Sequence, residues 1–521
     1  MEHPGLAAGA VLWRDYQVEI AGACLEANSL VVLPTGLGKT VVAALVIAEC
    51  LTRTPGRVLL LAPTRPLCIQ HEARLKQWLA GPRPIVAVTG KRRSKERRAA
   101  EQAARIVVAT PQVVANDIAS GQFDLASFAL VVFDEAHRAV GDYQYVDVGR
   151  AVTALKAEAR PLVLGLTASP GHEEERVLEV RRNLLIERIE SRTSDDQDVA
   201  HHMKRLDVEW RRVPFPEVLQ GPRDRLQKLL DERVQKLRRL GFLRHKKNTQ
   251  VTKRDVLEVA GLLSARMKKQ RAPYLFAGFL HQGVALHAAN CLELIECEGV
   301  EALRAYIARL EADDPRRKDK AFVNDRHTKA VRRFLAQQKK EIHPKFDELP
   351  KLLADAFARR PGAKAIVFAQ YRDTVSTIVD VLDSRGIKAR RFVGQAARGK
   401  EKGMSQDEQR AGLAAFEKGD YPVLVASSVG EEGIDIPAVD LVVFFEAVPS
   451  EIRSIQRRGR AGRTAAGHVV VLITAGTRDE KMAFAGAARE RKMKRLVQGM
   501  RRPRVEMKSA LEAWTGHGEE E

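Results

Sequence analysis

A glycine-containing loop between an apolar segment and a helical segment is the feature that most constrains this chain. Residues 29–33 are long enough for one buried strand, and residues 41–48 are typical of a helix. Glycine lets such a loop turn its amides toward phosphate oxygens, and the dipole of the following helix favours an anion. The sequence therefore predicts a phosphate-binding loop formed by Pro34, Thr35, Gly36, Leu37, Gly38, Lys39 and Thr40.

Two side chains of this loop point to a nucleoside triphosphate. Lys39 would reach the β- and γ-phosphates, and the hydroxyl of Thr40 would hold Mg²⁺. One departure is visible, because Leu33 stands where the usual pattern has its first glycine. The alternative is a glycine-rich turn with an incidental Lys-Thr pair, but the flanking strand and helix favour the phosphate site. ATP and Mg²⁺ are therefore the expected cofactors.

Composition bounds the class of protein. The chain has 521 residues, which predicts two to four domains, and its formal net charge is +20. This excess favours a polyanionic partner, foremost nucleic acid, although a basic proteome would give the same composition. The five cysteines lack Cys-x-x-Cys spacing, which indicates reduced core residues. Since no apolar run approaches membrane-spanning length, we expect a cytoplasmic, nucleoid-associated protein with no membrane partner.

The strand signals fall into two blocks, each alternating with helical segments, as in parallel sheets covered by helices on both faces. The first block has expected strands at residues 29–33, 57–62, 85–88, 106–109, 129–133 and 162–166. The second has them at residues 365–369, 389–392, 423–426, 441–444 and 468–473. Polar residues follow the strand ends, where ligands of such sheets bind. The expected fold class is α/β, with two parallel-sheet domains.

Long helical segments separate the two blocks and predict an all-helical insertion. The expected division is residues 1–195 (first α/β domain), 196–216 (connector), 217–342 (insertion), 343–500 (second α/β domain) and 501–521 (tail). A solvated helix face and a nucleic-acid clamp both remain compatible with the charges of the insertion. Its first part is strongly basic, with Arg223, Arg225, Lys228, Arg233, Lys236, Arg238, Arg239, Arg244, Lys246, Lys247, Lys253 and Arg254.

Paired acids follow the buried strand at 129–133. Asp134 would bind Mg²⁺, usually through water, and Glu135 would orient and deprotonate the attacking water. Two acids that merely cap a helix are the alternative. Upstream of the first strand, Gln17, next to Arg14, has the amide geometry that reads both edges of adenine, although this signal is weak when taken alone.

Arginines and glycines cluster in the second α/β block. The string at 456–463 contains Gln456, Arg460 and Arg463, and guanidinium groups suit the charge that develops on a transferred γ-phosphate. A basic nucleic-acid patch is the alternative. Upstream, Gly433 and Asp435 belong to a glycine-rich string that permits close approach to phosphate or ribose. A plain turn would also explain those glycines.

In this order, the strings resemble the motifs of a superfamily 2 helicase of the DEAH-box type, whose two RecA-like motor domains match both α/β blocks. The strings are Arg14–Gln17, Pro34–Thr40, Ala62–Leu67, Ala109–Gln112, Asp134–His137, Thr167–Ser169, Val367–Arg372, Ser427–Pro437 and Gln456–Arg463. The resemblance implies coupling roles for His137, Thr167 and Ser169. It also implies nucleic-acid backbone contacts for Thr64, Arg65, Gly90, Thr110, Gln370, Arg372, Gly394, Gln409 and Ser427.

A narrower resemblance is to Hef and the Fanconi anaemia M-type translocases. It is carried by residues 165–171, 343–345, 392–395 and 403–409 and by the helical insertion. It implies a 3′-to-5′ motor on branched or single-stranded DNA that remodels stalled forks and Holliday junctions in repair and recombination, with the insertion as a thumb-like grip. A monomeric motor is expected, and a separate nuclease or sliding clamp is a candidate partner.

Three departures refine these expectations. Ser427 stands where the family usually has threonine, which keeps the hydroxyl. The chain ends soon after the second α/β block, so no DNA cleavage is expected from it. Between Pro437 and Pro449 there is room for one strand only, which favours a translocase over a processive strand-splitting unwinder.

Two rival functions remain open at this point. A double-stranded-RNA-dependent ATPase of the RIG-I and Dicer type shares the insertion and several motifs, but usually has cysteine where this chain has alanine in Asp134–His137. An ATP-gated DNA-binding scaffold would need no motor. The intact Lys39, Glu135 and Arg460 argue against the scaffold.

Overall fold

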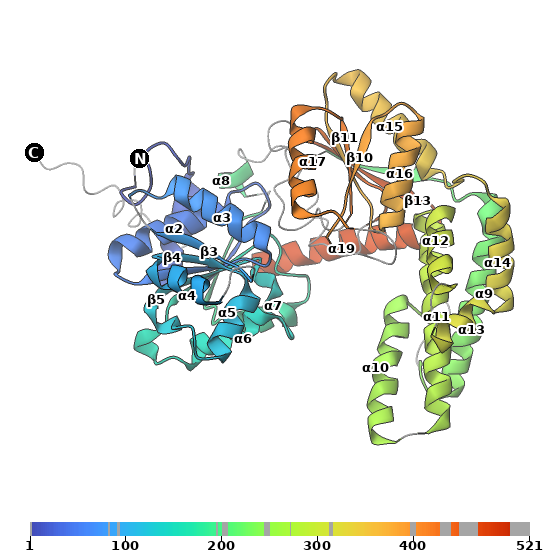
Figure 1. Cartoon of the computed structure of the whole chain (residues 1–521), viewed down its shortest axis with the longest axis horizontal. Coiled ribbons are helices and arrows are strands. Elements are labelled where there is room, and N and C mark those ends of the chain that lie inside the picture. The colour runs from blue at the N-terminus through green and yellow to red at the C-terminus, as the bar shows by residue number, and fades with distance from the viewer. Residues whose placement is uncertain are drawn as a thin grey trace, which may run out of the picture.

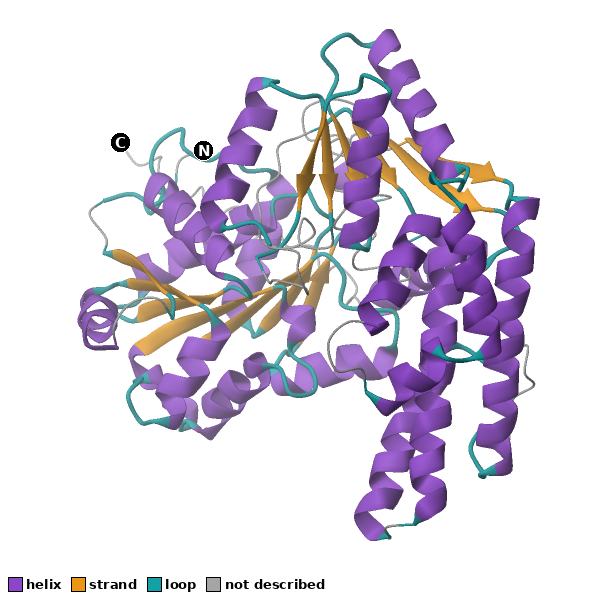
Figure 2. Cartoon of the chain, turned by 45° about the vertical axis from the view of Figure 1, so that its right-hand side comes forward, coloured by secondary structure: helices purple, strands orange, loops and turns teal. Residues whose placement is uncertain are grey.

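The computed structural model describes residues 3–81, 84–90, 94–193, 196–200, 207–243, 251–270, 272–311, 316–395, 403–427, 439–447 and 467–500. These residues form two parallel sheets, each with flanking helices, and a helical body (Figures 1 and 2). The expected fold class is thereby confirmed. No helix in the described ranges combines the length and the apolar character needed to cross a bilayer.

The first sheet has the order β3-β4-β2-β5-β6-β1-β7, and all its strand pairs are parallel. Its strands are β1 (Ser29–Val32), β2 (Arg57–Leu61), β3 (Ile85–Val88), β4 (Ile106–Ala109), β5 (Phe128–Asp134), β6 (Leu162–Thr167) and β7 (Arg188–Ser191). Its helices are α1 (Asp15–Glu26), α2 (Lys39–Arg53), α3 (Arg65–Trp78), α4 (Ser94–Ala103), α5 (Pro111–Ala119), α6 (Gln144–Ala154), α7 (Glu174–Asn183) and α8 (Gln197–Ala200).

The central strands are buried on both faces, which is why they read as continuous apolar runs. Successive residues of a strand point to opposite faces. Val58 and Leu60 therefore join the core under α2, whereas Leu59 and Leu61 join the core on the other face. This two-sided burial leaves the strand ends as the places where polar side chains can gather.

The second sheet has the order β10-β11-β9-β12-β13-β8 and is also parallel throughout. Its strands are β8 (Asp207–Val213), β9 (Ala365–Phe368), β10 (Ala389–Phe392), β11 (Val423–Ala426), β12 (Leu441–Phe444) and β13 (His468–Thr474). The associated helices are α15 (Lys345–Arg359), α16 (Arg372–Ser384), α17 (Gln406–Lys418) and α19 (Arg478–Gly499).

Two strands were not expected from the sequence. β7 and β8 are edge strands, and β8 lies inside the segment expected to be a connector at 196–216. The sequence of β8, Asp-Val-Glu-Trp-Arg-Arg-Val, is charged, and most of it is exposed or half-buried. Edge strands tolerate and even favour charge, so they lack the apolar run by which the central strands were found.

The described residues of the insertion form helices and connecting loops with no strand, and in Figure 2 the insertion stands beside the second sheet. Its helices are α9 (Glu217–Arg239), α10 (Lys253–Lys269), α11 (Pro273–Cys297), α12 (Val300–Glu311), α13 (Arg317–Val323) and α14 (Arg326–Gln337). The buried helix α11 forms the centre of this body, with α9, α10 and α13 packed against it.

Buried charges fasten the insertion to the second domain. The carboxylate of Glu296 on α11 is fully buried and accepts hydrogen bonds from Nε of Arg223 (2.8 Å) and from Arg478 at the start of α19 (2.6 Å). Close by, Nζ of Lys345 lies 2.6 Å from Oδ2 of Asp479, and both side chains have no exposure. Breaking a pair of this kind leaves a buried uncompensated charge, which costs about 3–5 kcal/mol.

Helix α19 connects the two α/β domains, and Figure 1 shows it running in red from the second domain to the first. Near its end, Met493 and Val497 are buried in the same core as Val177 and Val180 of α7. The last turns of α19 therefore pack in the core of the first domain, although they follow the second sheet in the chain.

Glu298, which follows α11, gives this junction a pH dependence. Burial raises the pKa of its carboxyl to about 7; the nearby Asp479 and Glu293 act in the same direction and Lys345 acts against them. The folded chain then holds a proton that the unfolded chain has lost above its ordinary pKa of 4.5. Stability from this group is therefore full below about pH 4.5 and is lost as the pH rises through about 7.

We predict that Glu298→Gln removes this loss. The melting temperature of the variant, relative to the natural protein, should rise between pH 5 and pH 8 and then stay level. Scanning calorimetry across that range measures the difference, and Glu217→Gln, at an exposed position on α9, is the matched control. A difference for Glu298→Gln that is independent of pH would contradict the assignment.

Candidate active site

Three strand ends of the first sheet lie level and bring the predicted site together. Val32 pairs with Thr167, and Asp134 pairs with Leu166, so β1, β6 and β5 end side by side. The amide of Leu33 donates to the carbonyl of Thr167 (3.1 Å), which fixes the start of the phosphate loop. The loop, Thr167 and Asp134 therefore share one edge of the sheet, where ligands of parallel sheets bind.

The loop has the backbone of a phosphate cradle. Gly36 and Gly38 adopt φ values of 92° and 76°, a region that suits glycine, and α2 begins directly after Gly38. A Cβ at Gly36 would meet nothing within 4 Å, so the loop is open on that side. Nζ of Lys39 donates to the carbonyl of Leu33 (3.1 Å) across the loop. These residues, with Pro34, Thr35, Leu37 and Thr40, fit a bound triphosphate.

Gln17 is buried against this loop. Its Nε2 donates to the carbonyl of Leu37 (3.0 Å), and its Oε1 accepts from the amide of Arg14 (2.9 Å). The hydroxyl of Tyr16 donates to the same Leu37 carbonyl (2.8 Å). A Cβ on Gly38 would collide with Nε2 of Gln17. Gln17 therefore braces the loop here, and pairing with adenine would require it to exchange these bonds.

Asp134 ends β5 and is buried. Its Oδ2 lies 2.9 Å from Nε2 of His71, and its Oδ1 accepts from the amide of Glu135 (3.0 Å). Burial alone would raise the pKa of the Asp134 carboxyl, but the His71 contact, the Lys39 charge and the Glu135 amide outweigh it and hold that pKa low. An ionised oxygen ligand near the loop fits Mg²⁺, which Asp134 and Thr40 would hold together.

Glu135 has an unusual backbone for its residue type, with φ at 52°. Such strain costs about 1–3 kcal/mol and collects at functional sites. Its buried Oε2 has no hydrogen-bond partner among the described residues and lies 3.3 Å from Nδ1 of His137. An acceptor held in this way can orient a water for attack, and a bound Mg²⁺ would neutralise charge on the phosphates.

A chain of hydrogen bonds continues from His137. Oγ1 of Thr167 lies 3.1 Å from Nδ1 of His137, donates to the carbonyl of Ser169 (2.9 Å) and accepts from its amide (3.1 Å). Since the hydroxyl proton is used on Ser169, Nδ1 of His137 is the donor toward Thr167. Oγ of Ser169 in turn contacts Sδ of Met493 on α19 (2.6 Å). The three residues expected to couple the motor thus form one connected path to α19.

We predict that Glu135→Gln lowers ATP hydrolysis by about 10²- to 10⁴-fold, because the amide cannot accept the proton of the attacking water. Nucleotide affinity should change little, since the amide keeps the shape of the carboxylate. Phosphate release and the binding of a fluorescent nucleotide measure the two effects separately. Glu158→Gln, at an exposed position in the same domain, is the control. Equal hydrolysis by Glu135→Gln and the natural protein would overturn the role.

The expected backbone contacts lie at strand ends of both sheets. Thr64 and Thr110 are the N-caps of α3 and α5, and neither side chain makes a capping hydrogen bond. Oγ1 of Thr64 and Nε of Arg65 are buried and have no hydrogen-bond partner among the described residues. Gly90 is exposed after β3. The two buried atoms lack a partner in the described part of the chain, and a phosphate oxygen that reached them would supply one.

The contacts expected in the second domain gather in the same manner. A guanidinium nitrogen of Arg372 donates to the carbonyl of Gly394 (2.9 Å), and Gln370 precedes α16. The amide of Ser427 donates to Phe392, and its buried Oγ has no hydrogen-bond partner among the described residues.

Gln409 differs from its expected role as a backbone contact. Its side chain is 5% exposed, and its Nε2 donates to the carbonyl of Val393 (2.9 Å), beside Gly394. The structure therefore places Gln409 beneath the loop as a brace, because a buried amide must satisfy its own hydrogen bonds. The expected residues Gln456, Arg460, Arg463, Gly433 and Asp435 lie outside the described residues.

The sequence did not single out His71, Tyr145 or Met493, which all touch the site. The hydroxyl of Tyr145 donates to the carbonyls of Asp134 (2.6 Å) and Leu61 (3.1 Å). The one signal in the sequence was a polar or sulfur-containing side chain on the buried face of a helix. Their partners lie from 11 to 324 positions away along the chain, so local patterns do not reveal these contacts.

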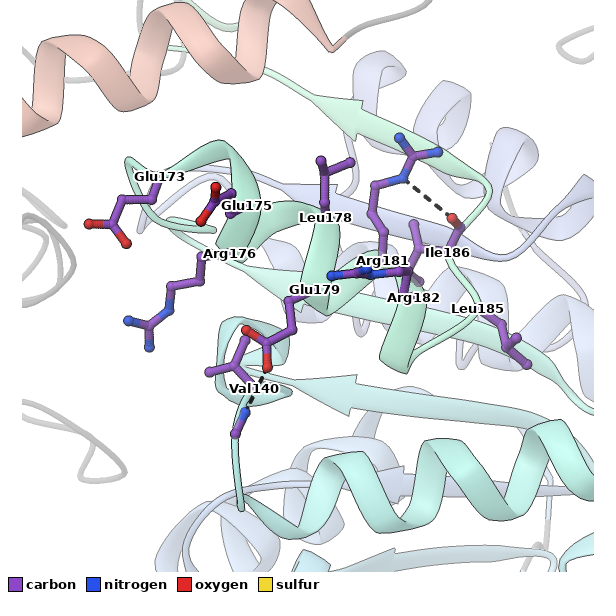
Figure 3. A pocket seen from close by; sticks show the side chains of 11 residues that line it. Val140, Glu173, Glu175, Arg176, Leu178, Glu179, Arg181, Arg182, Leu185 and Ile186 are labelled. Carbon is purple, nitrogen blue, oxygen red and sulfur yellow. Dashed lines mark hydrogen bonds between the residues drawn. The ribbon is translucent and has the colours of Figure 1, made fainter. Parts of the chain in front are cut away.

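A cavity of about 1310 Å³ lies beside α7, away from the phosphate loop (Figure 3). Its lining mixes both charges, including Glu173, Arg176 and Glu179. Oε1 of Glu179 accepts from the amide of Gly141, and Nε of Arg181 donates to the carbonyl of Ile186. Because these groups serve the local backbone, we assign no ligand to this cavity.

Comparison with known proteins agrees with this geometry. The DEAD/DEAH box helicase family model matches residues 14–177, and the helicase conserved C-terminal domain matches residues 344–465. A model named putative ATP-dependent RNA helicase, helical bundle, matches residues 218–343. The crystal structure of the Hef helicase domain of Pyrococcus furiosus is 41% identical with a TM-score of 0.66, and the match covers 91% of this chain and 98% of that one. The chain belongs to the Hef family of superfamily 2 helicases.

Three similar proteins are longer than this chain. A putative ATP-dependent RNA helicase of Methanocaldococcus jannaschii is 39% identical over 96% of this chain and 62% of its own length. An ATP-dependent DNA helicase of Pyricularia oryzae is 33% identical, and the match covers 94% of this chain and 46% of that relative. The Fanconi anemia group M protein of Gallus gallus is 30% identical, and the match covers 95% of this chain and 27% of that relative. The chain thus spans less than two thirds of each of these relatives. Its helicase domains imply an ATP-dependent helicase that uses a metal ion with ATP.

Proposed function

We propose that this chain is a 3′-to-5′ DNA translocase that binds and remodels branched DNA, such as stalled forks and Holliday junctions, in repair and recombination. The proposal rests on the connected path from Glu135 through His137, Thr167 and Ser169 to Met493 on α19. Such a path suits a motor in which nucleotide chemistry in one domain moves the other. Several relatives are named DNA helicases, which supports DNA as the substrate.

The charges of the insertion support a nucleic-acid grip once the paired ones are set aside. Arg223 and Arg233 are used in ion pairs with Glu296 and Asp325. A basic stripe remains along α9, formed by the exposed residues Arg225, Lys228, Lys236 and Arg239.

The basic stripe suits a phosphate backbone in both geometry and chemistry. At about 100° per residue its four side chains fall within roughly 80° of the helix surface, over a length of about 21 Å, and the one acid in that sector, Glu232, is paired with Arg326. A stripe of this length spans several successive phosphates. Phosphate contacts of this kind would make binding independent of sequence and steeply dependent on salt.

Double-stranded RNA is the second candidate substrate. The Methanocaldococcus jannaschii relative and the helical-bundle model both carry RNA helicase in their names. No described residue reveals a contact that would distinguish a ribose 2′-hydroxyl. In either case a monomeric motor is expected, acting in the cytoplasm at the nucleoid, with a separate nuclease or sliding clamp as the candidate protein partner.

We predict that a four-way or forked DNA stimulates ATP hydrolysis more than single-stranded DNA, plain duplex or matching RNA at one salt concentration. The variant Arg225→Glu/Lys236→Glu should lose affinity for the branched DNA, and its salt slope should fall by about one unit for each phosphate contact removed. Its hydrolysis without nucleic acid should stay unchanged.

Lys351→Glu is the control, because Lys351 is an exposed lysine on α15, away from the stripe. Stronger stimulation by RNA duplex would move the protein to the RNA-dependent class. No stimulation by any nucleic acid would leave only an ATP-gated scaffold.

A further inference from the structure

His71 joins two parts of the molecule that the proposed function uses separately. It lies on α3, which begins at Arg65 with Thr64 as its N-cap, and the residue is only 4% exposed. Its Nε2 lies 2.9 Å from Oδ2 of Asp134. Since an ionised carboxylate only accepts, Nε2 carries the proton and donates it to Asp134. One imidazole therefore connects a nucleic-acid element to the proposed metal ligand.

The other imidazole nitrogen indicates that the bond to Asp134 is the reason for a histidine at this position. Nδ1 of His71 is buried and has no hydrogen-bond partner among the described residues. A histidine retained only to fill the core would leave a polar atom unsatisfied, at a cost of about 1–3 kcal/mol. The ring is instead aimed at Asp134, which indicates that the bond to the carboxylate is what the position requires.

Helix α3 is stiff over the distance that matters. Thr64 and His71 are seven residues apart, which is about two turns and roughly 10 Å, and they lie on the same face of the helix. Cys68 lies between them on that face, is buried, and directs its thiol at the carbonyl of Ala62. A shift of the first turn of α3 would therefore be carried to His71 with little loss.

A second tie holds the same two segments. The hydroxyl of Tyr145 bridges the carbonyl of Leu61, the last residue of β2, and the carbonyl of Asp134. The end of β2, from which the chain leads into α3, is thus tied to the backbone of Asp134 through Tyr145, and α3 is tied to the carboxylate of Asp134 through His71. This leaves the orientation of the carboxylate itself as the feature that His71 controls.

We propose that His71 is a positioning residue that couples nucleic-acid contact at the first turn of α3 to the orientation of the Asp134 carboxylate. When a backbone phosphate engages Thr64 and Arg65, α3 is held in place, and His71 holds Oδ2, which would fix the orientation of the carboxylate toward a bound metal ion. The coupling part of this inference rests on the proposed function. The contact between His71 and Asp134 does not depend on it.

Three replacements of His71 separate the hydrogen bond from simple packing. His71→Leu keeps bulk but cannot donate. His71→Gln places an amide donor near the position of Nε2, whereas His71→Asn places one only near Nδ1. We expect Gln to behave like the natural protein and both Leu and Asn to lose the contact, so the Gln and Asn pair decides the matter if the Leu variant fails to fold.

The first measurement is the binding of fluorescent ADP as Mg²⁺ is titrated, which requires no turnover and no nucleic acid. For the Leu and Asn variants, the Mg²⁺ concentration at half-maximal binding should rise by about 10- to 100-fold, the usual effect of removing an outer hydrogen bond to a metal ligand. Binding of ADP without Mg²⁺ should not change. An unchanged Mg²⁺ dependence in these variants, or an equal loss in the Gln variant, would overturn the inference.

The second measurement is the ratio of ATP hydrolysis with and without branched DNA. The Leu and Asn variants should lose most of the stimulation at saturating Mg²⁺, and the Gln variant should keep it. Stimulation equal to that of the natural protein would overturn the coupling. If no nucleic acid stimulates the natural protein, the proposed function and the coupling both fail, while the Mg²⁺ titration still decides whether His71 positions Asp134.

Discussion

The level ending of β1, β6 and β5 is the constraint on which the site depends. Hydrogen bonding between parallel strands sets Val32 beside Thr167 and Asp134 beside Leu166, and the turns that follow have little freedom in where they emerge. Burial on both faces of the sheet leaves this edge as the place for polar chemistry. The strained backbone of Glu135 is tolerated because the well-packed strands on either side hold it.

The proposed motor also requires that the insertion and the two α/β domains be mechanically connected. Glu296 on α11 accepts hydrogen bonds from Arg478, and the buried Nζ of Lys345 donates to the carbonyl of Cys297, so these contacts fasten the insertion to the second domain. Helix α19 then returns to the first domain, where Met493 lies in its core and contacts Ser169. A change at Glu135 thus has a connected route to the surface that would hold nucleic acid. A motor of the proposed kind needs such a connection between its domains, whereas a rigid scaffold does not.

The sequence predicted the central strands and the residues at their ends because apolar runs and glycine loops are local signals. It could not find β8, whose charged edge reads as a connector, or the contacts of His71 and Met493, whose partners are distant in the chain. Gln17 was expected to bind the nucleotide and lies against the phosphate loop, but its bonds to Leu37 and Arg14 depend on packing that the sequence does not show. Gln409 shows the reverse case, since a motif residue proved to be a buried brace.

The central claim is that the edge formed by the phosphate loop and Asp134 holds a metal-bound nucleotide. Anomalous diffraction from crystals grown with Mn²⁺ and a non-hydrolysable ATP analogue tests it most directly. We expect one strong manganese peak between Thr40 and Asp134, with the triphosphate along Gly36–Lys39. A peak elsewhere in the chain, or a nucleotide bound away from this loop, would contradict it.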